Sequence, residues 1–376
     1  MRERLMPLLD RRILSQFNWS LLFLLLLLAG LGILNLYSAG ALRVDKGVTT
    51  SFYYQKQIFW FAIGLSAIPV IIIFNYRHLK EIVWPLYSVT IALLAYVLIF
   101  GTSISGAKRW IDLGPMSFQP TELAKVSVIL LTAALLSRIS GPVGWKSLGG
   151  ILGIVAIPVV LIFLQPDLGS GLNILMLVGG MLLFKGISKR VFLTCLVGIP
   201  LLAPGAWLIL LDYQKERILT FLHPHMDPLG AGYNTIQSQI AVGSGQIWGK
   251  GFLEGTQSQL RFLPAKHTDF VFSVFGEEWG FVGCIFLLTL FCLFLYQLVV
   301  VAGTSKDAFG SYIACGVFFY FFWQVLINIG MVLGLMPIVG IPLPFFSYGG
   351  SSTLINCILL GLVFSISMRR YIFTQE

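Results

Sequence analysis

Long apolar runs separated by short polar segments extend along the whole sequence. About 20 apolar residues in a helix cross the roughly 30 Å hydrocarbon core of a bilayer. The pattern therefore predicts an all-α polytopic membrane protein with about ten transmembrane helices. The predicted spans lie near 17–38, 57–74, 82–100, 121–137, 148–164, 170–186, 191–211, 270–301, 309–333 and 348–368.

Composition supports this class and excludes others. Hydrophobic residues make up 57% of the chain and charged residues only 11%, whereas soluble domains have about 45–50% and about 25%. A net charge of +9 could indicate nucleic-acid binding, but the basic residues punctuate apolar runs instead of clustering on one soluble face. The five cysteines all lie in apolar runs without metal-ligand spacing, so we expect buried residues and no disulfide.

Charge in the short loops predicts the orientation. More than half of the 25 Lys and Arg residues lie at the termini and in alternate loops, which marks that side as cytoplasmic. With an even number of crossings, both termini are expected there. The first run is long enough for a full span and no small-residue cleavage site follows it, so we expect a retained helix. The chain 1–376 is interpreted as one membrane domain.

The polar segments expected on the extracytoplasmic side are unequal. The longest, 212–269, lies between the seventh and eighth predicted helices, and loops of that length are usually functional or disordered. Its aromatic and apolar residues argue against disorder, so it is expected to fold onto the membrane surface. The segment 333–352 is uncharged and rich in Pro and Gly, which predicts a re-entrant stretch.

The end of the long loop carries acidic residues into an apolar run. In a helix, Asp269, Ser273 and Glu277 fall within roughly 80° of one another and form a polar stripe. Ionisable groups inside a span normally face a cavity or a charged partner, because exposure to lipid costs several kcal/mol. The simpler alternative is that Thr268 or Asp269 caps the helix and that Glu277 and Glu278 pair with basic residues.

A second set of candidates lies in the segment before the fourth helix. Arg109 beside Trp110 suits a phosphate and a sugar face, although Trp is also an ordinary interfacial anchor. Glu122 near a helix N-terminus is explained by the helix dipole alone. Lys125 lies one turn deeper and needs an acidic partner or an anionic ligand.

Asp167 interrupts an apolar run in the sequence QPDLGS. It could cap the following helix as a turn carboxylate. It could equally form an ion pair with Lys125 or Arg109. The sequence leaves both interpretations open.

Several familiar kinds of site are absent from the sequence. His223 and His225 lack a third ligand, so no zinc site is predicted. There is no P-loop and no G-x-S-x-G motif. The remaining residue types fit transfer from a phosphorylated lipid, which needs cations for a diphosphate leaving group and a carboxylate as general base.

The motifs together resemble the SEDS family, polytopic glycosyltransferases that polymerise lipid II into peptidoglycan. The resemblance rests on HTDFVFSVFGEEWG, KRWIDLG, FQPTELAK, QPDLGS, DPLGAGYNTIQSQIAVGSGQIWGKG and PLPFFSYGGSS, which occur in the family's order. Within the family, GTQSQLRFLP at 255–264 resembles the RodA, or elongation, branch more than the FtsW, or division, branch.

The resemblance implies a mechanism and a set of site residues. Asp269 would deprotonate the 4-hydroxyl of an incoming lipid II, which attacks the lipid-linked growing strand and releases undecaprenyl diphosphate. The resemblance also implies a substrate cavity beneath the long loop, lined by Lys108, Arg109, Trp110, Glu122, Lys125 and Asp167, with Arg217, Lys266, His267, Thr268, Glu277 and Ser347 as further candidates.

The resemblance also implies partners and a location. The family works with a class B penicillin-binding transpeptidase in the bacterial plasma (inner) membrane, with lipid II, undecaprenyl-linked glycan and membrane lipid around it. Gly276 and Gly280 form a small-xxx-small pair suited to close helix packing. Gln246 replaces a usual glycine of the family. The sequence leaves open whether a divalent cation, Mg²⁺ or Mn²⁺, helps to hold the diphosphate.

Two other functions compete with the enzyme. Broken helices and buried charges also suit a lipid II flippase, but such transporters usually have related halves and no internal repeat is visible. A non-catalytic scaffold for the transpeptidase would use the outer charges only for docking. A division-branch polymerase is the remaining alternative within the family.

Overall fold

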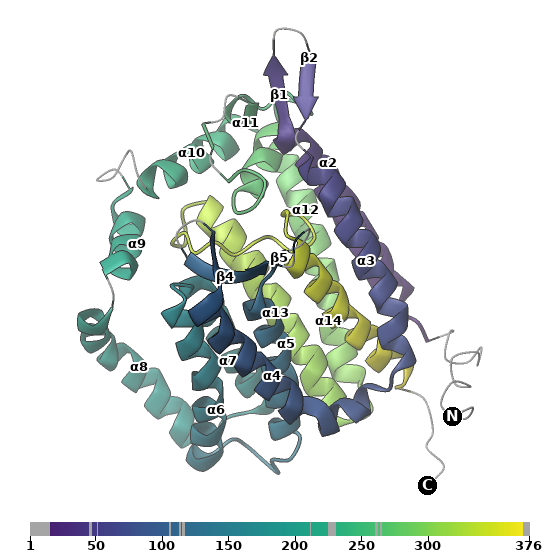
Figure 1. Ribbon diagram of the computed structural model, residues 1–376, viewed down its shortest axis with the longest axis vertical. Helices are drawn as coiled ribbons and strands as arrows, with labels where there is room; N and C mark the ends of the chain where they lie inside the picture. Colours follow the sequence, from purple (N-terminus) through teal and green to yellow (C-terminus); the bar gives the residue numbers. More distant parts are fainter. Residues whose placement is uncertain are drawn as a thin grey trace.

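Each of the ten apolar runs forms a helix in the computed structural model (Figure 1). The structure describes residues 16–44, 47–50, 52–104, 107–112, 114, 117–210, 212–224, 231–259, 262–263 and 265–370. The ten helices are α2 (Trp19–Gly40), α3 (Tyr53–Ile73), α4 (Leu79–Phe100), α5 (Pro120–Leu136), α6 (Trp145–Leu164), α7 (Leu168–Lys185), α8 (Lys189–Ile209), α12 (Val271–Thr304), α13 (Ala308–Val332) and α14 (Gly350–Met368). A single 3₁₀ turn, η3 (Tyr76–His78), precedes α4.

Eight of the described helices are long and apolar enough to cross a membrane. The other two of the ten are α5, which has 17 residues, and α8, which contains Pro200 and Pro204. The all-helical polytopic class is confirmed, and the crossing of α5 and α8 stays a prediction. Phe17 stacks on Phe364 with 4.8 Å between ring centroids, so the start of α2 lies beside the end of α14, as an even number of crossings requires.

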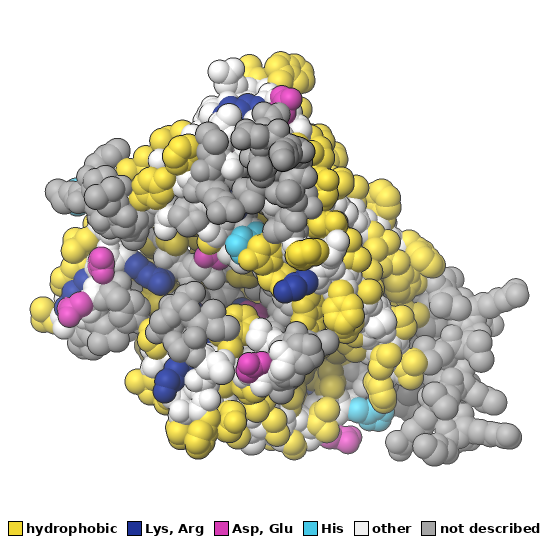
Figure 2. All heavy atoms as spheres, turned by 45° about the horizontal axis from the view of Figure 1, so that its top comes forward, with side chains coloured by type: hydrophobic (Ala, Val, Ile, Leu, Met, Phe, Trp, Pro, Cys, Tyr) yellow, Lys and Arg dark blue, Asp and Glu magenta, His cyan; other side chains and the backbone are white. Residues whose placement is uncertain are grey.

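Hydrophobic side chains cover much of the outer surface (Figure 2). Phe23 on α2, Phe100 on α4 and Leu208 on α8 are each at least 65% exposed. Helices that hydrogen-bond internally and show apolar side chains outward are what a lipid environment requires. In Figure 1, α8 lies at the edge of the bundle, whereas α13 and α14 lie at its centre.

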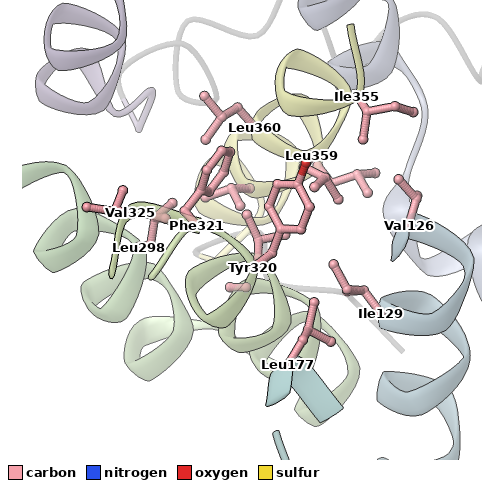
Figure 3. Close-up of a cluster of buried hydrophobic side chains, with 14 of the residues drawn as sticks. Val126, Ile129, Leu177, Leu298, Tyr320, Phe321, Val325, Ile355, Leu359 and Leu360 are labelled. Carbon is pink, nitrogen blue, oxygen red and sulfur yellow. The ribbon is translucent and has the colours of Figure 1, made fainter. Parts of the chain in front are cut away.

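The core lies where α5, α7, α12, α13 and α14 converge (Figure 3). Close approach of α3 to α14 depends on small residues, since a Cβ on Gly64 would lie 2.6 Å from the sulfur of Cys357. The side chains at the centre are Val126, Ile129, Leu177, Leu298, Tyr320, Phe321, Val325, Ile355, Leu359 and Leu360.

The connections at one end of the bundle contain short strands, which the all-α prediction did not include. β1 (Ala41–Val44) pairs antiparallel with β2 (Gly47–Thr50), and β4 (Ala107–Asp112) pairs with β3 (Thr102–Ile104) and β5 (Ser117–Phe118). Strand pairing supplies hydrogen-bond partners for the backbone N–H and C=O groups of these segments, which lie outside the helices. The long loop folds into α9 (Asp212–Leu222), α10 (Ala231–Ser244) and α11 (Thr256–Gln259) at the same end (Figure 1).

Residues 333–349, here called the strap, connect α13 to α14 without regular secondary structure. Leu343, Phe345 and Phe346 are almost fully buried. Gly32 on α2 has no side chain where the backbone of Phe345 passes, and a Cβ there would collide with it. The strap is thus packed into the helix bundle, in agreement with the predicted re-entrant stretch.

Candidate active site

Asp269 lies at the junction between the long loop and α12. The N-cap of α12 is Phe270 and no side chain caps it, so the predicted capping by Thr268 or Asp269 is wrong. The hydroxyl of Thr268 contacts the carbonyl of Ala265 instead, at 3.3 Å. The carboxylate of Asp269 is therefore not engaged in capping its own helix.

The backbone around Asp269 is held by residues from far along the chain. Asn328 of α13 donates its amide to the carbonyl of Asp269 at 3.0 Å and to a strap carbonyl at 2.8 Å. Ser347 donates its hydroxyl to the carbonyl of Thr268 at 2.6 Å. The amide of Tyr348 donates to the carbonyl of His267 at 2.9 Å. The segment 267–269 is thus held between α13 and the strap. Ser347, one of the candidate site residues from the sequence, lies beside Thr268.

Burial moves the pKa of Asp269 towards neutral pH. Burial raises its pKa to about 6, and a hydrogen bond from Thr268 and the charge of Arg217 partly oppose the rise. Asp269 as a whole residue is half-buried. Burial and the neighbouring Lys266 lower the pKa of His267. A general base works best with a pKa near the operating pH.

Arg109 and Asp167 form one ion pair. The guanidinium Nη1 lies 3.8 Å from Asp167 Oδ1, Nε donates to the carbonyl of Gln165 at 3.1 Å, and Nη2 contacts the carbonyl of Pro166. Asp167 also caps α7 by accepting from the amide of Ser170 at 3.1 Å. Both interpretations of Asp167 from the sequence are confirmed, with Arg109 as its partner.

The two neighbours of Arg109 on β4 differ in exposure. Lys108 is exposed and Trp110 is half-buried. Both lie in the same strand as Arg109, which is anchored at the corner between α6 and α7. The strand therefore offers an accessible cation and an indole next to an anchored guanidinium.

Lys125 pairs with Glu122 inside the bundle. Lys125 Nζ lies 2.6 Å from Glu122 Oε1, and the side chains are only 3% and 5% exposed. Lys125 Nζ also lies 5.6 Å from the centre of the Tyr320 ring, whose hydroxyl donates to Asn356 at 2.8 Å. The acidic partner required for Lys125 is thus Glu122, and neither side chain reaches the surface in this structure.

The predicted polar stripe on α12 is buried inside the protein. Ser273 and Glu277 are fully buried, and Asp269 precedes the helix. Glu277 Oε1 accepts from Lys250 Nζ at 2.7 Å, whereas Glu278 accepts from the hydroxyl of Ser38. Among the described residues, a basic partner is therefore found for Glu277 and not for Glu278.

The strap brings two groups of candidates to one place. A Cβ placed on Gly340 would lie 3.7 Å from Asp269 Oδ2. The preceding Val339 packs on Gly169, two residues after Asp167. Gly169, near Asp167 of the Arg109–Asp167 pair in sequence, and Asp269 therefore lie beside adjacent residues of the strap. Lys, Arg, Asp and Glu side chains surround the centre of the face on which the long loop lies (Figure 2).

Some residues around this site were not anticipated. Tyr53 at the start of α3 stacks on His267 with 4.0 Å between ring centroids. Asn328 is a polar residue inside an apolar run, and such a residue must find partners when buried. The place of Asn328 inside an apolar run was therefore a feature of the sequence that could have identified it. A hollow of about 410 Å³ in the long loop is lined by Ser244–Lys250, and none of the predicted site residues lines it.

Comparisons with known proteins identify the family of this chain. The family profile of FtsW, RodA and SpoVE cell cycle proteins matches residues 18–372. The chain is 42% identical over 294 residues to the peptidoglycan glycosyltransferase MrdB of Escherichia coli K12, covering 77% of this chain and 79% of MrdB. It is 32% identical over 428 residues to the peptidoglycan glycosyltransferase RodA of Treponema pallidum, covering 95% and 98%.

A solved structure gives the same result for the fold. A chain of a peptidoglycan synthase complex that coordinates polymerization and crosslinking superposes with a TM-score of 0.81 and 34% identity, covering 96% of this chain and 99% of that one. The resemblance seen in the sequence motifs is confirmed by these matches. This chain therefore belongs to the FtsW, RodA and SpoVE family.

Proposed function

We propose that this chain polymerises the glycan strands of peptidoglycan from lipid II during cell elongation, with Asp269 as the general base. The similarity to MrdB and RodA supports the reaction and the branch. The observation that carries the mechanism is a carboxylate with a pKa of about 6, held at the start of α12 by α13 and the strap.

The proposed reaction is a single displacement at the anomeric carbon of the growing strand. Asp269 takes the proton of the 4-hydroxyl of the incoming lipid II, and that oxygen forms the new bond to the anomeric carbon. The bond from this carbon to the diphosphate breaks, and undecaprenyl diphosphate leaves with the electron pair. A base poised near neutral pH speeds such a step by about 10²–10⁴-fold.

The Arg109 corner supplies positive charge for the leaving group. Its guanidinium is oriented by two carbonyls and Asp167, and Lys108 beside it is exposed. Cations fixed where negative charge develops stabilise the transition state. Glu122 and Lys125 are proposed to support the site from beneath, because they are buried against each other.

A divalent cation would have to be held mainly by the diphosphate. Among the described residues, no group of three or more His, Cys, Asp or Glu side chains converges. Mg²⁺ commonly binds through substrate phosphates and one or two carboxylates. Such an ion would neutralise charge on the leaving diphosphate. Polymerisation measured with and without a chelator tests this.

We also propose that the site lies on the extracytoplasmic face and that a class B penicillin-binding transpeptidase binds there. The termini and the loops on the opposite side together carry more than half of the Lys and Arg residues. The related chain of known structure belongs to a complex that coordinates polymerization and crosslinking.

Purified protein with lipid II tests the catalytic role of Asp269. Asp269→Asn should abolish polymerisation while the melting temperature in detergent stays near that of the wild type. Glu216→Gln, which changes an exposed carboxylate on α9, is the matched control and should keep full activity. Full activity of Asp269→Asn would refute the mechanism, and lipid II translocation in liposomes without polymer would favour a flippase.

A further inference from the structure

Helix α12 is interrupted at Gly280. Its φ of 63° and ψ of −163° lie in a region of backbone space that essentially only glycine adopts. In an unbroken helix, the amides of Phe281 and Val282 would donate to the carbonyls of Glu277 and Glu278. The break separates these donors from these acceptors, and buried backbone groups without partners are costly.

The long loop supplies the missing partners. Residues 245–257, here called the clamp loop, pass across the break and bond to both sides of it. Two loop carbonyls accept from the freed amides, and two loop amides donate to the freed carbonyls. The four bonds are Phe281 N to Gln246 O (2.8 Å), Val282 N to Ile247 O (3.1 Å), Lys250 N to Glu277 O (3.0 Å) and Gly251 N to Glu278 O (3.0 Å).

Glycines permit this contact. A Cβ on Gly245 would collide with the carbonyl of Gly276, and one on Gly249 would collide with that of Glu278. A Cβ on Gly280 would lie 2.7 Å from a clamp-loop carbonyl oxygen. Gly276 thus faces Val242 of α10, in agreement with the close helix packing that the spacing suggested, whereas Gly280 faces the clamp loop.

An ion pair between the buried Glu277 and the partly exposed Lys250 links the clamp loop to α12. Glu277 is fully buried, and its Oε1 accepts from Lys250 Nζ at 2.7 Å, from Thr256 Oγ1 at 3.0 Å and from the amide of Gln257 at 3.0 Å. Lys250 Nζ also donates to Thr256 Oγ1 at 2.8 Å. A buried carboxylate is tolerated only when it is paired and hydrogen-bonded. Lys250 is the cation that compensates Glu277.

We propose that Lys250 and Glu277 are positioning residues for Asp269: by locking the clamp loop across the break, they set the direction of the short helix 271–279. This proposal rests on the proposed role of Asp269 as general base. Asp269 lies eleven residues before Gly280, about 16 Å along the helix axis. A tilt of about 5° at the break would move it by about 1.5 Å, and a misplacement of about 1 Å can cost on the order of 100-fold in rate.

The test is the kinetics of lipid II polymerisation by the full-length protein in detergent. Lys250→Met and Glu277→Gln should each lower kcat by on the order of 100-fold, with the KM for lipid II changed by less than about 3-fold. The double variant leaves no unpaired charge and should regain at least about 10-fold of that loss. Lys250→Arg should stay near wild type, and Lys146→Met, at an exposed lysine on α6, is the control.

Other outcomes would overturn the proposal. A lower melting temperature with unchanged kcat of the folded protein would show that the pair only stabilises. A raised KM without recovery in the double variant would show that Lys250 binds substrate. If the charge variants do not fold, Thr256→Val is used instead, because it removes one hydrogen bond to Glu277 without changing any charge. An unchanged kcat in that variant would refute the positioning role. Asp269→Asn is assayed in parallel. If it keeps full activity, the general-base role fails; if it is inactive while the Lys250 and Glu277 variants keep the wild-type kcat, only the positioning role fails.

Discussion

The protonation of Asp269 predicts the pH dependence of the reaction. With a pKa of about 6, about 90% of the side chains are ionised at pH 7 and about 10% at pH 5. An aspartate with an ordinary pKa of about 3.9 would stay more than about 90% ionised at pH 5. Because a base must be deprotonated to act, activity is lost as the pH falls. We expect kcat/KM to drop roughly ten-fold between pH 7 and pH 5.

The assay is the initial rate of polymerisation at low lipid II concentration, with the melting temperature followed across the same pH range. The charge of Arg217 lowers the pKa of Asp269, so Arg217→Met should move the midpoint to higher pH. Burial and Lys266 lower the pKa of His267 below its ordinary value, and His267→Gln should leave the midpoint of Asp269 in place. A profile that stays flat to pH 5, or a midpoint that disappears with His267, would refute the assignment.

Three further predictions concern stability, measured by thermal unfolding in detergent. Gln246→Gly should stabilise the protein by about 1 kcal/mol, because the φ of 49° at Gln246 is left-handed backbone; a lower melting temperature would contradict this. Gly280→Ala should destabilise it by about 3 kcal/mol, whereas Gly303→Ala, with no atom within 4 Å of the new Cβ, should not destabilise it. Lys125→Met should cost about 3–5 kcal/mol by leaving Glu122 buried and unpaired, and adding Glu122→Gln should recover most of that; equal losses in both variants would show that the pair is not coupled.

The helices could be predicted from the sequence because their cause is local. In lipid, a segment must satisfy its own backbone hydrogen bonds and present apolar side chains outward, and the composition of each run shows this directly. The same logic placed Asp269 correctly at the edge of α12. The Lys125–Glu122 pair also follows from local spacing, since residues three apart in a helix are neighbours.

The environment of Asp269 could not be predicted because it depends on contacts between distant segments. Nothing in the loop 265–269 indicates that Asn328 and Ser347 will bind its backbone. The break at Gly280 is similar: the spacing of small residues suggested helix packing, but the clamp loop supplies the contact. Patterns along the chain show which residues are unusual, and only the fold shows what they meet.

The anchoring of Asp269 by the strap has a consequence for biosynthesis. The partners of this segment, Asn328 and Ser347, follow Asp269 and Thr268 by 59 and 79 residues. A ribosome-bound chain that has inserted α12 therefore already carries the carboxylate but cannot yet hold its backbone in place. The carboxylate acquires its final surroundings only once the strap has been translated and has folded back between the helices. We therefore expect that a chain truncated before the strap does not hold the backbone of Thr268 and Asp269 in place.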